Sequence, residues 1–125
     1  MKILIISGSG FVGTNLADIL SKNHDVTIVS KYQHKFSSEI TGINYVYEDW
    51  KHFDYFQLFS VENYDKIFLL GWSDHPRSSN NKIYTSFTEN VLTNMHIIDQ
   101  IVHDTSADIY FLSSFGALPK INSSY

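Results

Sequence analysis

Three glycines stand close together near the beginning of the chain, at Gly8, Gly10 and Gly13. Their spacing is G-x-G-x-x-G, and they separate a short apolar run from a helix-like pattern. In such a turn the first glycine permits a tight bend, the second lets a pyrophosphate approach the backbone, and the third lets the helix pack on the strand. Backbone N–H groups and the positive end of the helix would hold the phosphates. The motif predicts a dinucleotide site, with a purely structural turn as the alternative.

Gly8 and Gly13 also have the spacing of a phosphate-binding loop of the Walker type, which is a competing interpretation. That loop requires Lys directly after its second glycine, followed by Ser or Thr. Here Thr14 and Asn15 follow Gly13. Because the lysine is missing, the sequence excludes a site of this kind.

Other side chains that could do chemistry lie outside the glycine turn. His96 and His103 are seven residues apart in one helical pattern, but no further ligands accompany them, so we predict a solvated helix face and no metal site. The chain has no cysteine, which excludes disulfides, thiol nucleophiles and cysteine-based zinc sites. Asp74, His75 and Arg77 follow a predicted strand, where they could contact a cofactor or a substrate phosphate. A polar loop explains them equally well.

The elements that must position these residues alternate along the chain. Apolar runs predict strands at 3–6, 26–30, 43–48, 66–71 and 108–114, and helical periodicity predicts helices at 11–20, 51–59 and 80–104. Alternation of this kind implies a parallel sheet covered on both faces. We therefore predict one α/β domain over 1–125, a doubly wound, Rossmann-like sheet of about five strands in the order 3-2-1-4-5, truncated after the fifth strand. Its ligand crevice would lie beside the first strand, at the carboxyl ends.

Composition and charge narrow the class of protein. The 125 residues are 43% hydrophobic and 18% charged, which suits a globular protein, and the formal net charge is −4. The negative charge and the single small basic cluster, at 31–35, argue against nucleic-acid binding. The early apolar run is too short for a signal-peptide core or a membrane span. We expect a cytoplasmic protein with neither a nucleic-acid nor a membrane partner.

Several segments resemble the NAD-dependent epimerase/dehydratase family, the extended short-chain dehydrogenase/reductases that act largely on nucleotide sugars. The opening "ILIISGSGFVGTNLADIL" is similar to the family's first strand, glycine turn and helix, and "HDVTIVSK" is similar to its second strand. Later segments resemble the family in the same order: "YEDW", "YDKIFLLGW", "TENVLTNMHIID" and "IYFLSSFGA". The resemblance therefore runs along the whole chain.

This resemblance implies a set of site residues. The cofactor-binding positions that it implies are Gly8, Ser9, Gly10, Phe11, Val12, Gly13, Ser30, Lys31, Asp49, Trp50, Leu70, Gly71, Trp72 and Asn90. Within this set, Asp49 corresponds to the aspartate that reaches the adenine. Ser114 corresponds to the catalytic serine, whose hydroxyl orients the substrate oxygen while a Tyr acts as general acid/base and a Lys lowers the pKa of that Tyr.

The sequence also departs from the family's pattern. The family motif is usually G-x-x-G-x-x-G, and Ser7 stands at its first glycine position. The usual His and Ala-Ala of the fourth strand are Leu69, Gly71 and Trp72 here. The catalytic Tyr-x-x-x-Lys and the sugar-binding C-terminal region are absent from these residues. Tyr125 would be the catalytic Tyr only with an unusually short loop after the serine.

The end of the second predicted strand bears on the choice of cofactor. An NAD-preferring site has an acidic residue there, which accepts hydrogen bonds from the ribose hydroxyls. Ser30 and Lys31 occupy that place, while Asp25 lies at the opposite end of the strand. Without the carboxylate a 2′-phosphate is not repelled, and Lys31 would attract it. The sequence favours NADP(H) over NAD(H); a solvated Lys31 with poor selectivity is the alternative.

These observations predict the NAD(P)-binding portion of a nucleotide-sugar epimerase, dehydratase or reductase. Two alternatives remain open, a non-catalytic dinucleotide-binding or sensing module and an inactive truncated fragment. The small-molecule partner would be a nucleotide sugar, and a homo-oligomer is compatible with the sequence. A large exposed apolar patch beside the fifth strand would indicate a fragment or an oligomer.

Overall fold

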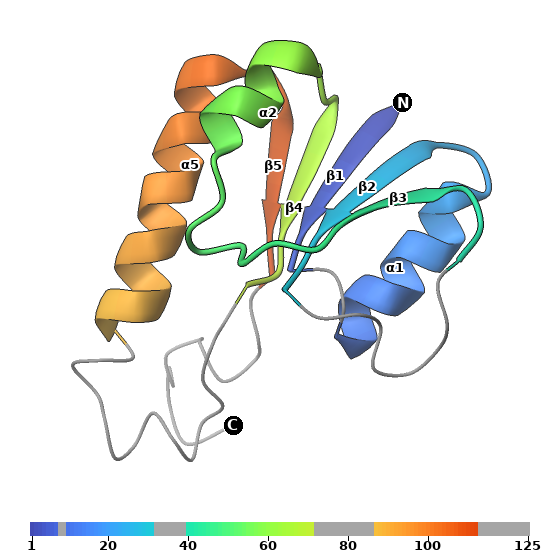
Figure 1. Cartoon of the computed structure of the whole chain (residues 1–125), viewed down its shortest axis with the longest axis horizontal. Coiled ribbons are helices and arrows are strands. Elements are labelled where there is room, and N and C mark those ends of the chain that lie inside the picture. The colour runs from blue at the N-terminus through green and yellow to red at the C-terminus, as the bar shows by residue number, and fades with distance from the viewer. Residues whose placement is uncertain (8–9, 32–39, 72–86, 113–125) are drawn as a thin grey trace, which may run out of the picture.

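The computed structural model describes residues 1–7, 10–31, 40–71 and 87–112. Its strands are β1 (Lys2–Ile6), β2 (Asp25–Val29), β3 (Ile43–Val46), β4 (Lys66–Leu69) and β5 (Asp108–Phe111). They form one parallel sheet in the order β3-β2-β1-β4-β5 (Figure 1). The predicted α/β fold and strand order are therefore confirmed.

Three strands are shorter than the apolar runs predicted. β3 and β4 each end two residues before the predicted ends at 48 and 71, and β5 ends at Phe111, before the predicted end at 114. Pairing nevertheless continues past β4, because the N–H of Leu70 donates to the carbonyl oxygen of Ile6 at 3.1 Å. The residues just after the strands thus remain tied to the sheet.

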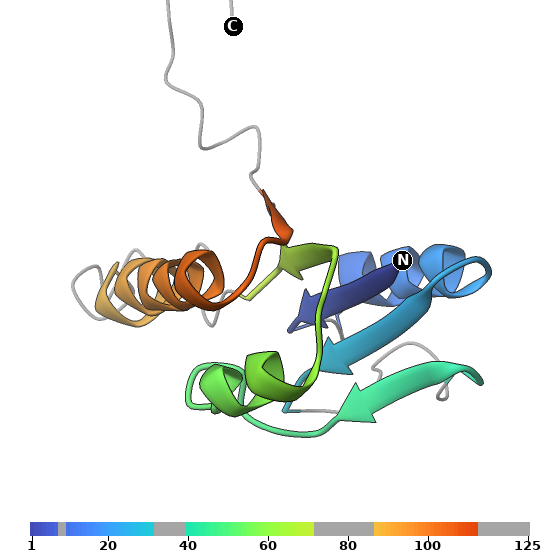
Figure 2. The same cartoon turned by 90° about the horizontal axis from the view of Figure 1, so that it is seen from above.

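The helices cover both faces of the sheet. α1 (Phe11–Ser21) lies on one face, and α2 (Tyr55–Val61) and α5 (Thr93–Asp104) lie on the other (Figure 2). α2 begins at Tyr55, later than the predicted residue 51, because Asp54 caps it by accepting a hydrogen bond from the N–H of Gln57 at 3.2 Å. No helix in the described part of the chain is long and apolar enough to span a membrane.

The predicted helix over 80–104 does not have one uniform geometry. Its described part begins with a π-helical segment, η1 (Phe87–Leu92), which continues directly into α5. Residues 80–86 lie outside the described residues. The widened turn matters for the site, because π-helical turns inside helices are frequent at functional positions.

The side chains of β1 supply both hydrophobic cores. Leu4 and Ile6 belong to the core under α2 and α5, whereas Ile3 and Ile5 belong to the core under α1. All four are at most 1% exposed. Full burial of each such side chain contributes about 1.5–3 kcal/mol, so β1 is the centre of the fold. This confirms the prediction of a strand buried on both faces.

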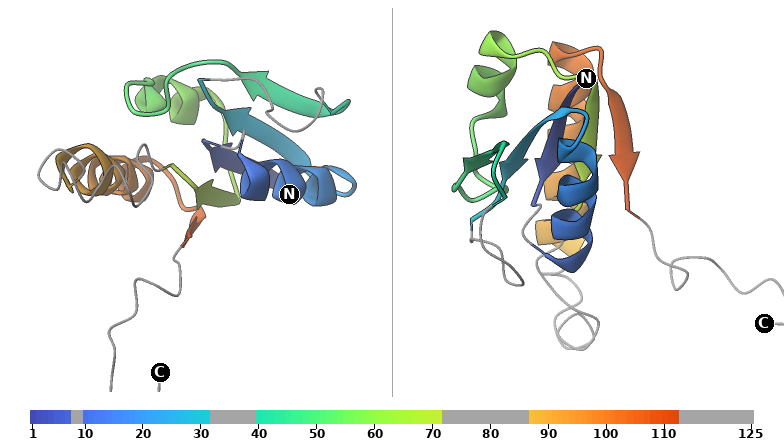
Figure 3. Two further views of the ribbon diagram at one scale, coloured as in Figure 1. Left: turned by 90° about the horizontal axis from the view of Figure 1, so that it is seen from below. Right: turned by 90° about the vertical axis from the view of Figure 1, so that its right-hand side faces the viewer.

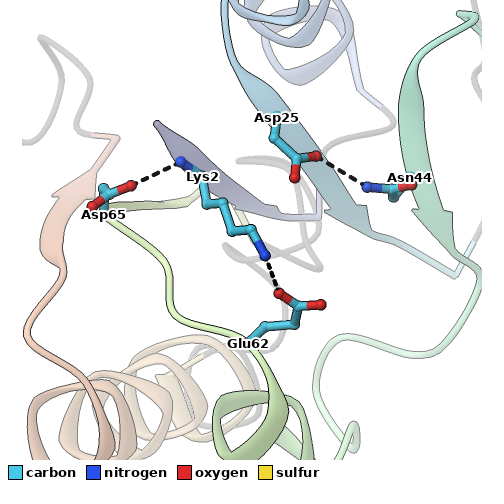
Figure 4. Close-up of polar contacts among 5 residues, drawn as sticks. All are labelled: Lys2, Asp25, Asn44, Glu62 and Asp65. Atoms are coloured by element: carbon cyan, nitrogen blue, oxygen red, sulfur yellow. Dashed lines mark hydrogen bonds and ion pairs between the residues drawn. The ribbon is translucent and has the colours of Figure 1, made fainter.

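The edge at which the strands begin is closed by polar contacts (Figure 4). The backbone N–H of Lys2 donates to the Asp65 carboxylate at 2.8 Å, and the Lys2 ammonium pairs with Glu62. The amide of Asn44 donates to Asp25 at 3.2 Å. The hydrogen bond to Glu62 raises the pKa of Lys2. These exposed contacts are individually weak, and together they connect β1, β2 and β3 with the segment before β4.

β5 forms one edge of the described sheet and carries exposed apolar side chains. Tyr110, Phe111 and Leu112 are 41%, 48% and 53% exposed. The ring of Tyr110 stacks on Phe68 with centroids 4.8 Å apart, and its hydroxyl accepts a hydrogen bond from Lys66 Nζ at 3.0 Å. Exposed apolar groups therefore lie along this edge of the described sheet.

Candidate functional site

One edge of the sheet gathers most of the described site residues that the sequence predicts. All five strands end there, and α1 and the η1–α5 helix begin there (Figures 1 and 3). The segments that follow β1, β2, β3 and β4 bring to this edge Gly10, Ser30, Lys31, Asp49, Trp50, Leu70 and Gly71. Open α/β sheets bind ligands at such an edge.

Some predicted residues lie outside the described part of the chain. These are Gly8, Ser9, Trp72, Asp74, His75, Arg77, Ser114 and Tyr125. Their predicted roles stay predictions.

Ser7 carries the bend between β1 and the glycine turn. Its φ is 64°, in the left-handed region that residues with a Cβ adopt at a cost. Its N–H donates to the carbonyl oxygen of Val29 at 2.6 Å, so β2 holds the bend in place. Ser7 stands where the resembled family has its first glycine, and a left-handed φ is the conformation for which glycine is suited. Ser7 therefore has a glycine-like backbone conformation, although its residue type differs from that of the family.

The beginning of α1 has the properties of an anion site. Gly10 is the N-cap residue with extended backbone, no described side chain caps the helix, and the first turn has no acidic residue. A Cβ placed on Gly10 would meet no described atom within 4 Å, so the space beside its backbone is open. Phe11 and Val12 are 68% and 46% exposed, whereas Gly13 is buried. A helix beginning without an acidic cap offers its N–H groups and positive dipole to a phosphate.

Ser30 and Lys31 follow β2 and differ in exposure. Ser30 is 4% exposed, and its N–H donates to the carbonyl oxygen of Val46 at 3.0 Å. Lys31 is exposed. The ammonium of Lys31 is therefore the group at the end of β2 that a ligand in solution can reach, while Ser30 is part of the packed sheet.

Asp49 and Trp50 follow β3, and their side chains have different surroundings. The half-buried Asp49 carboxylate accepts a hydrogen bond from the N–H of Lys51 at 3.1 Å, which fixes it in a tight turn. The Trp50 indole is 7% exposed and lies in the core under α2 and α5. The Trp50 carbonyl oxygen accepts a hydrogen bond from the buried Tyr55 hydroxyl at 2.6 Å. Trp50 thus has a packing role, and its predicted cofactor contact stays a prediction.

Gly71, two residues after the end of β4, is held against Trp50. A Cβ at Gly71 would lie 2.7 Å from Cη2, Cζ2 and Cζ3 of the indole, closer than real Cβ contacts. The missing side chain is therefore what lets Trp50 pack here. The departure of Gly71 from the family's alanine has a physical cause, namely the large side chain at Trp50.

Two asparagines lie one helical turn apart where η1 meets α5. Asn90 is 0% exposed and Asn94 is 2% exposed. Asn94 Nδ2 donates to the Gly71 carbonyl oxygen at 3.0 Å and to the Asn90 carbonyl oxygen at 2.8 Å. Sequence reasoning selected Asn90 and missed Asn94. A second asparagine four residues later, inside an apolar helical stripe, was the available signal.

The two histidines of the last helical pattern both lie on α5. His96 and His103 are both exposed on α5. Among the described residues, no group of three or more His, Cys, Asp or Glu side chains could hold a metal ion.

Comparison with known families and structures adds independent findings. A family model described as the NAD dependent epimerase/dehydratase family matches residues 3–124. No curated protein matches the chain significantly in sequence.

Several solved structures have the same fold. One is UDP-glucose 4-epimerase from Thermotoga maritima with UDP-glucose, with a TM-score of 0.82 and 18% identity over 100% of this chain and 41% of that one. Another is an epimerase from Methanothermobacter thermautotrophicus, with a TM-score of 0.78 and 21% identity over 96% of this chain and 37% of that one. A third is UDP-glucose 4-epimerase from Bifidobacterium longum with NAD+ and UDP, with a TM-score of 0.75 and 18% identity over 92% of this chain and 37% of that one. The chain thus spans about two fifths of these structures.

Proposed function

Because this chain belongs to the NAD-dependent epimerase/dehydratase family, we propose that it binds the dinucleotide cofactor of a nucleotide-sugar epimerase, dehydratase or reductase. The observation that carries the proposal is the β1–α1 turn. It combines the left-handed Ser7, the open backbone of Gly10 and a helix start without a described side-chain cap. These features leave space and positive potential for a pyrophosphate.

In the proposed complex the chain's backbone does most of the binding. N–H groups in the first turn of α1 donate to the pyrophosphate, and the open side of Gly10 lets it approach. The exposed Phe11 and Val12 cover the cofactor from solvent. The bound dinucleotide would supply a nicotinamide that accepts and returns a hydride.

The adenosine end of the cofactor would lie near the ends of β2 and β3. We assign Lys31 to the 2′-phosphate of the ribose and Asp49 to the adenine. The family is described as NAD-dependent, and the Bifidobacterium longum epimerase binds NAD+. In contrast, Ser30 and Lys31 stand at the end of β2 in place of an acidic residue, and this favours NADP(H). The preference for NADP(H) is part of the proposal.

Ser114 is the catalytic group that we propose within this sequence, orienting the substrate oxygen by a hydrogen bond. A serine hydroxyl alone does not supply the proton transfer that the reaction needs. Because the chain spans about two fifths of its structural neighbours, the general acid/base and the sugar site belong to the proposal for the whole protein. The Thermotoga maritima epimerase binds UDP-glucose and the Bifidobacterium longum epimerase binds UDP, which supports a UDP-sugar as substrate class. A cytoplasmic location and a homo-oligomer also stay proposals.

Calorimetric titration of the whole protein with NADP+ and NAD+, followed by a turnover assay on UDP-sugars, tests this function. We expect at least one dinucleotide to bind in the micromolar range and a UDP-sugar to be converted. Binding without any turnover would favour the non-catalytic binding module. Lack of binding of either dinucleotide at millimolar concentration would contradict the proposal.

A further inference from the structure

The side chain of Asn94 is the one buried polar group at the carboxyl edge whose hydrogen bonding is incomplete among the described residues. Both protons of its Nδ2 are used, by the carbonyl oxygens of Gly71 and Asn90 at 3.0 and 2.8 Å. This arrangement fixes the orientation of the amide, since the reversed orientation would point Oδ1 at two other oxygens. Oδ1 then has no hydrogen-bond partner within the described structure.

A buried carbonyl oxygen without a donor is unfavourable, and such groups in folded proteins almost always have a partner. Asn94 is 2% exposed, so a bulky ligand does not reach Oδ1 without displacing the helix. A single water molecule is small enough, and it can also donate to a second acceptor nearby. The carbonyl oxygen of Gly71 is such an acceptor, because it has two lone pairs and Asn94 Nδ2 uses one of them.

Asn94 also connects two parts of the proposed cofactor edge. Its bond to Gly71 fixes the carbonyl group of the second residue after β4, and its bond to Asn90 spans the junction of η1 and α5. Trp50 holds the same glycine from the other side through its indole ring. The position of Gly71 is thus set by one apolar contact and one hydrogen bond.

We propose that Asn94 is a positioning residue for this edge and that its Oδ1 binds one internal water molecule. The residue acts through Gly71 and Asn90, without touching the cofactor. The positioning role rests on the proposed function, because its consequence is dinucleotide affinity. The water site does not depend on that function.

Two variants of the whole protein test the positioning role. Asn94→Leu has a similar volume and removes the donors and the acceptor. Asn94→Thr can still donate to the Asn90 carbonyl oxygen four residues before it, but its shorter side chain does not reach Gly71. Met95→Leu, at a 60% exposed position on the same helix, is the matched control. We expect both Asn94 variants to weaken dinucleotide binding at least tenfold, and the control to bind as the wild type does.

Unfolding in urea, measured on the same variants, separates positioning from stability. Asn94→Thr should be more stable than Asn94→Leu, and it should still bind the dinucleotide weakly. Wild-type affinity in a folded Asn94→Thr or Asn94→Leu protein would overturn the positioning role. If the wild type binds no dinucleotide, the proposed function fails and the positioning role fails with it.

A high-resolution crystal structure tests the water site independently. We expect a water oxygen at about 2.7–3.2 Å from Asn94 Oδ1 in the wild type. A well-ordered Asn94 with no water, or with a protein donor on Oδ1, would overturn this part of the proposal.

Discussion

Ser7 is the residue at which the backbone of the nucleotide turn departs most from ordinary geometry. Its φ of 64° costs a residue with a Cβ about 1–2 kcal/mol, and glycine avoids that cost. Glycine also loses more conformational entropy on folding, which offsets part of the gain. We expect Ser7→Gly to raise the free energy of unfolding by up to about 1 kcal/mol, measured by urea denaturation.

Ser7→Ala is the matched control, because it keeps the Cβ and removes only the hydroxyl. It should not be more stable than the wild type. If Ser7→Ala gains as much as Ser7→Gly, or if the glycine variant gains nothing, backbone strain at Ser7 is the wrong explanation.

Lys31 decides the predicted cofactor preference. Its ammonium is exposed, so its attraction for a 2′-phosphate is screened by solvent and worth about 1 kcal/mol at most. We expect Lys31→Ala to weaken NADP+ binding by about fivefold and to leave NAD+ binding unchanged, as measured by calorimetry. Lys22→Ala, at an exposed position at the end of α1 away from the site, serves as the control. An equal loss for both cofactors would contradict a role in selecting NADP+.

At the scale of elements, Trp50 and Gly71 connect the segment after β3 with the end of β4. A methyl group on Gly71 would lie 2.7 Å from the indole, and Trp50 is packed among Tyr55, Phe59 and other core side chains. We expect Gly71→Ala to lower the free energy of unfolding by about 1–3 kcal/mol, because overpacking forces neighbouring side chains to move.

A double-mutant cycle checks whether Trp50 is the cause. Trp50→Leu by itself should cost several kcal/mol through the cavity that it leaves. In that background Gly71→Ala should cost much less than in the wild type, with a coupling energy of about 0.5–3 kcal/mol. Additive losses would show that Gly71 is restricted by something other than the indole.

Sequence patterns predicted the elements well wherever burial alone determines them. The run Ile3–Ile6 is apolar because β1 contacts a core on each face, and a run this short favours a buried strand over a buried helix. The start of α2 was harder to predict, since the aromatic residues before it continue the apolar pattern and only the Asp54 cap marks the boundary. The π-helical turn of η1 was not predictable, because the spacing of its apolar residues does not distinguish it from an ordinary α-helix.

The candidate site was predictable in its location and less so in its contacts. A parallel sheet necessarily brings the residues after its strands to one edge, so the common location of Gly10, Lys31 and Asp49 followed from the strand order. The residues themselves were selected by the glycine motif, by the residue type at the end of the second strand and by the family resemblance. The direction of the Trp50 indole depends on the space left by Gly71, which is distant in sequence. Asn94 was missed for the same reason, because its role depends on a hydrogen bond across the fold.

At the scale of the whole molecule, buried tyrosines set the alkaline limit of stability. Burial raises the pKa of Tyr55 above the ordinary value near 10, and burial likewise raises the pKa of Tyr64. Above about pH 10 the unfolded chain loses these protons while the folded protein keeps them, so the unfolded state is favoured. Stability should be independent of these groups well below pH 10 and fall above it, by up to about 1.4 kcal/mol per pH unit from Tyr55, with a further loss from Tyr64.

Urea denaturation between about pH 9 and pH 11 measures this dependence. Tyr55→Phe should be less stable at neutral pH, because the Trp50 carbonyl oxygen loses its partner, and should show a shallower decline above pH 10. A wild type whose stability does not fall in this range would contradict the account. So would a Tyr55→Phe variant with the slope of the wild type.

The central claim is that the beginning of α1 binds the pyrophosphate of a dinucleotide, and substitution of Gly10 tests it most directly. Both Asp and Asn fit its extended backbone and the open space beside it, and both are favourable helix N-caps. Each variant should therefore be at least as stable as the wild type. They differ in one negative charge, placed where the phosphates are proposed to lie.

The decisive measurement is calorimetric titration of Gly10→Asp and Gly10→Asn with NADP+ and NAD+. We expect Gly10→Asp to bind at least tenfold more weakly than Gly10→Asn, a difference of about 1.4 kcal/mol or more, because the carboxylate repels the pyrophosphate. Equal affinity of the two folded variants, in a protein whose wild type binds the cofactor, would contradict a pyrophosphate at this helix.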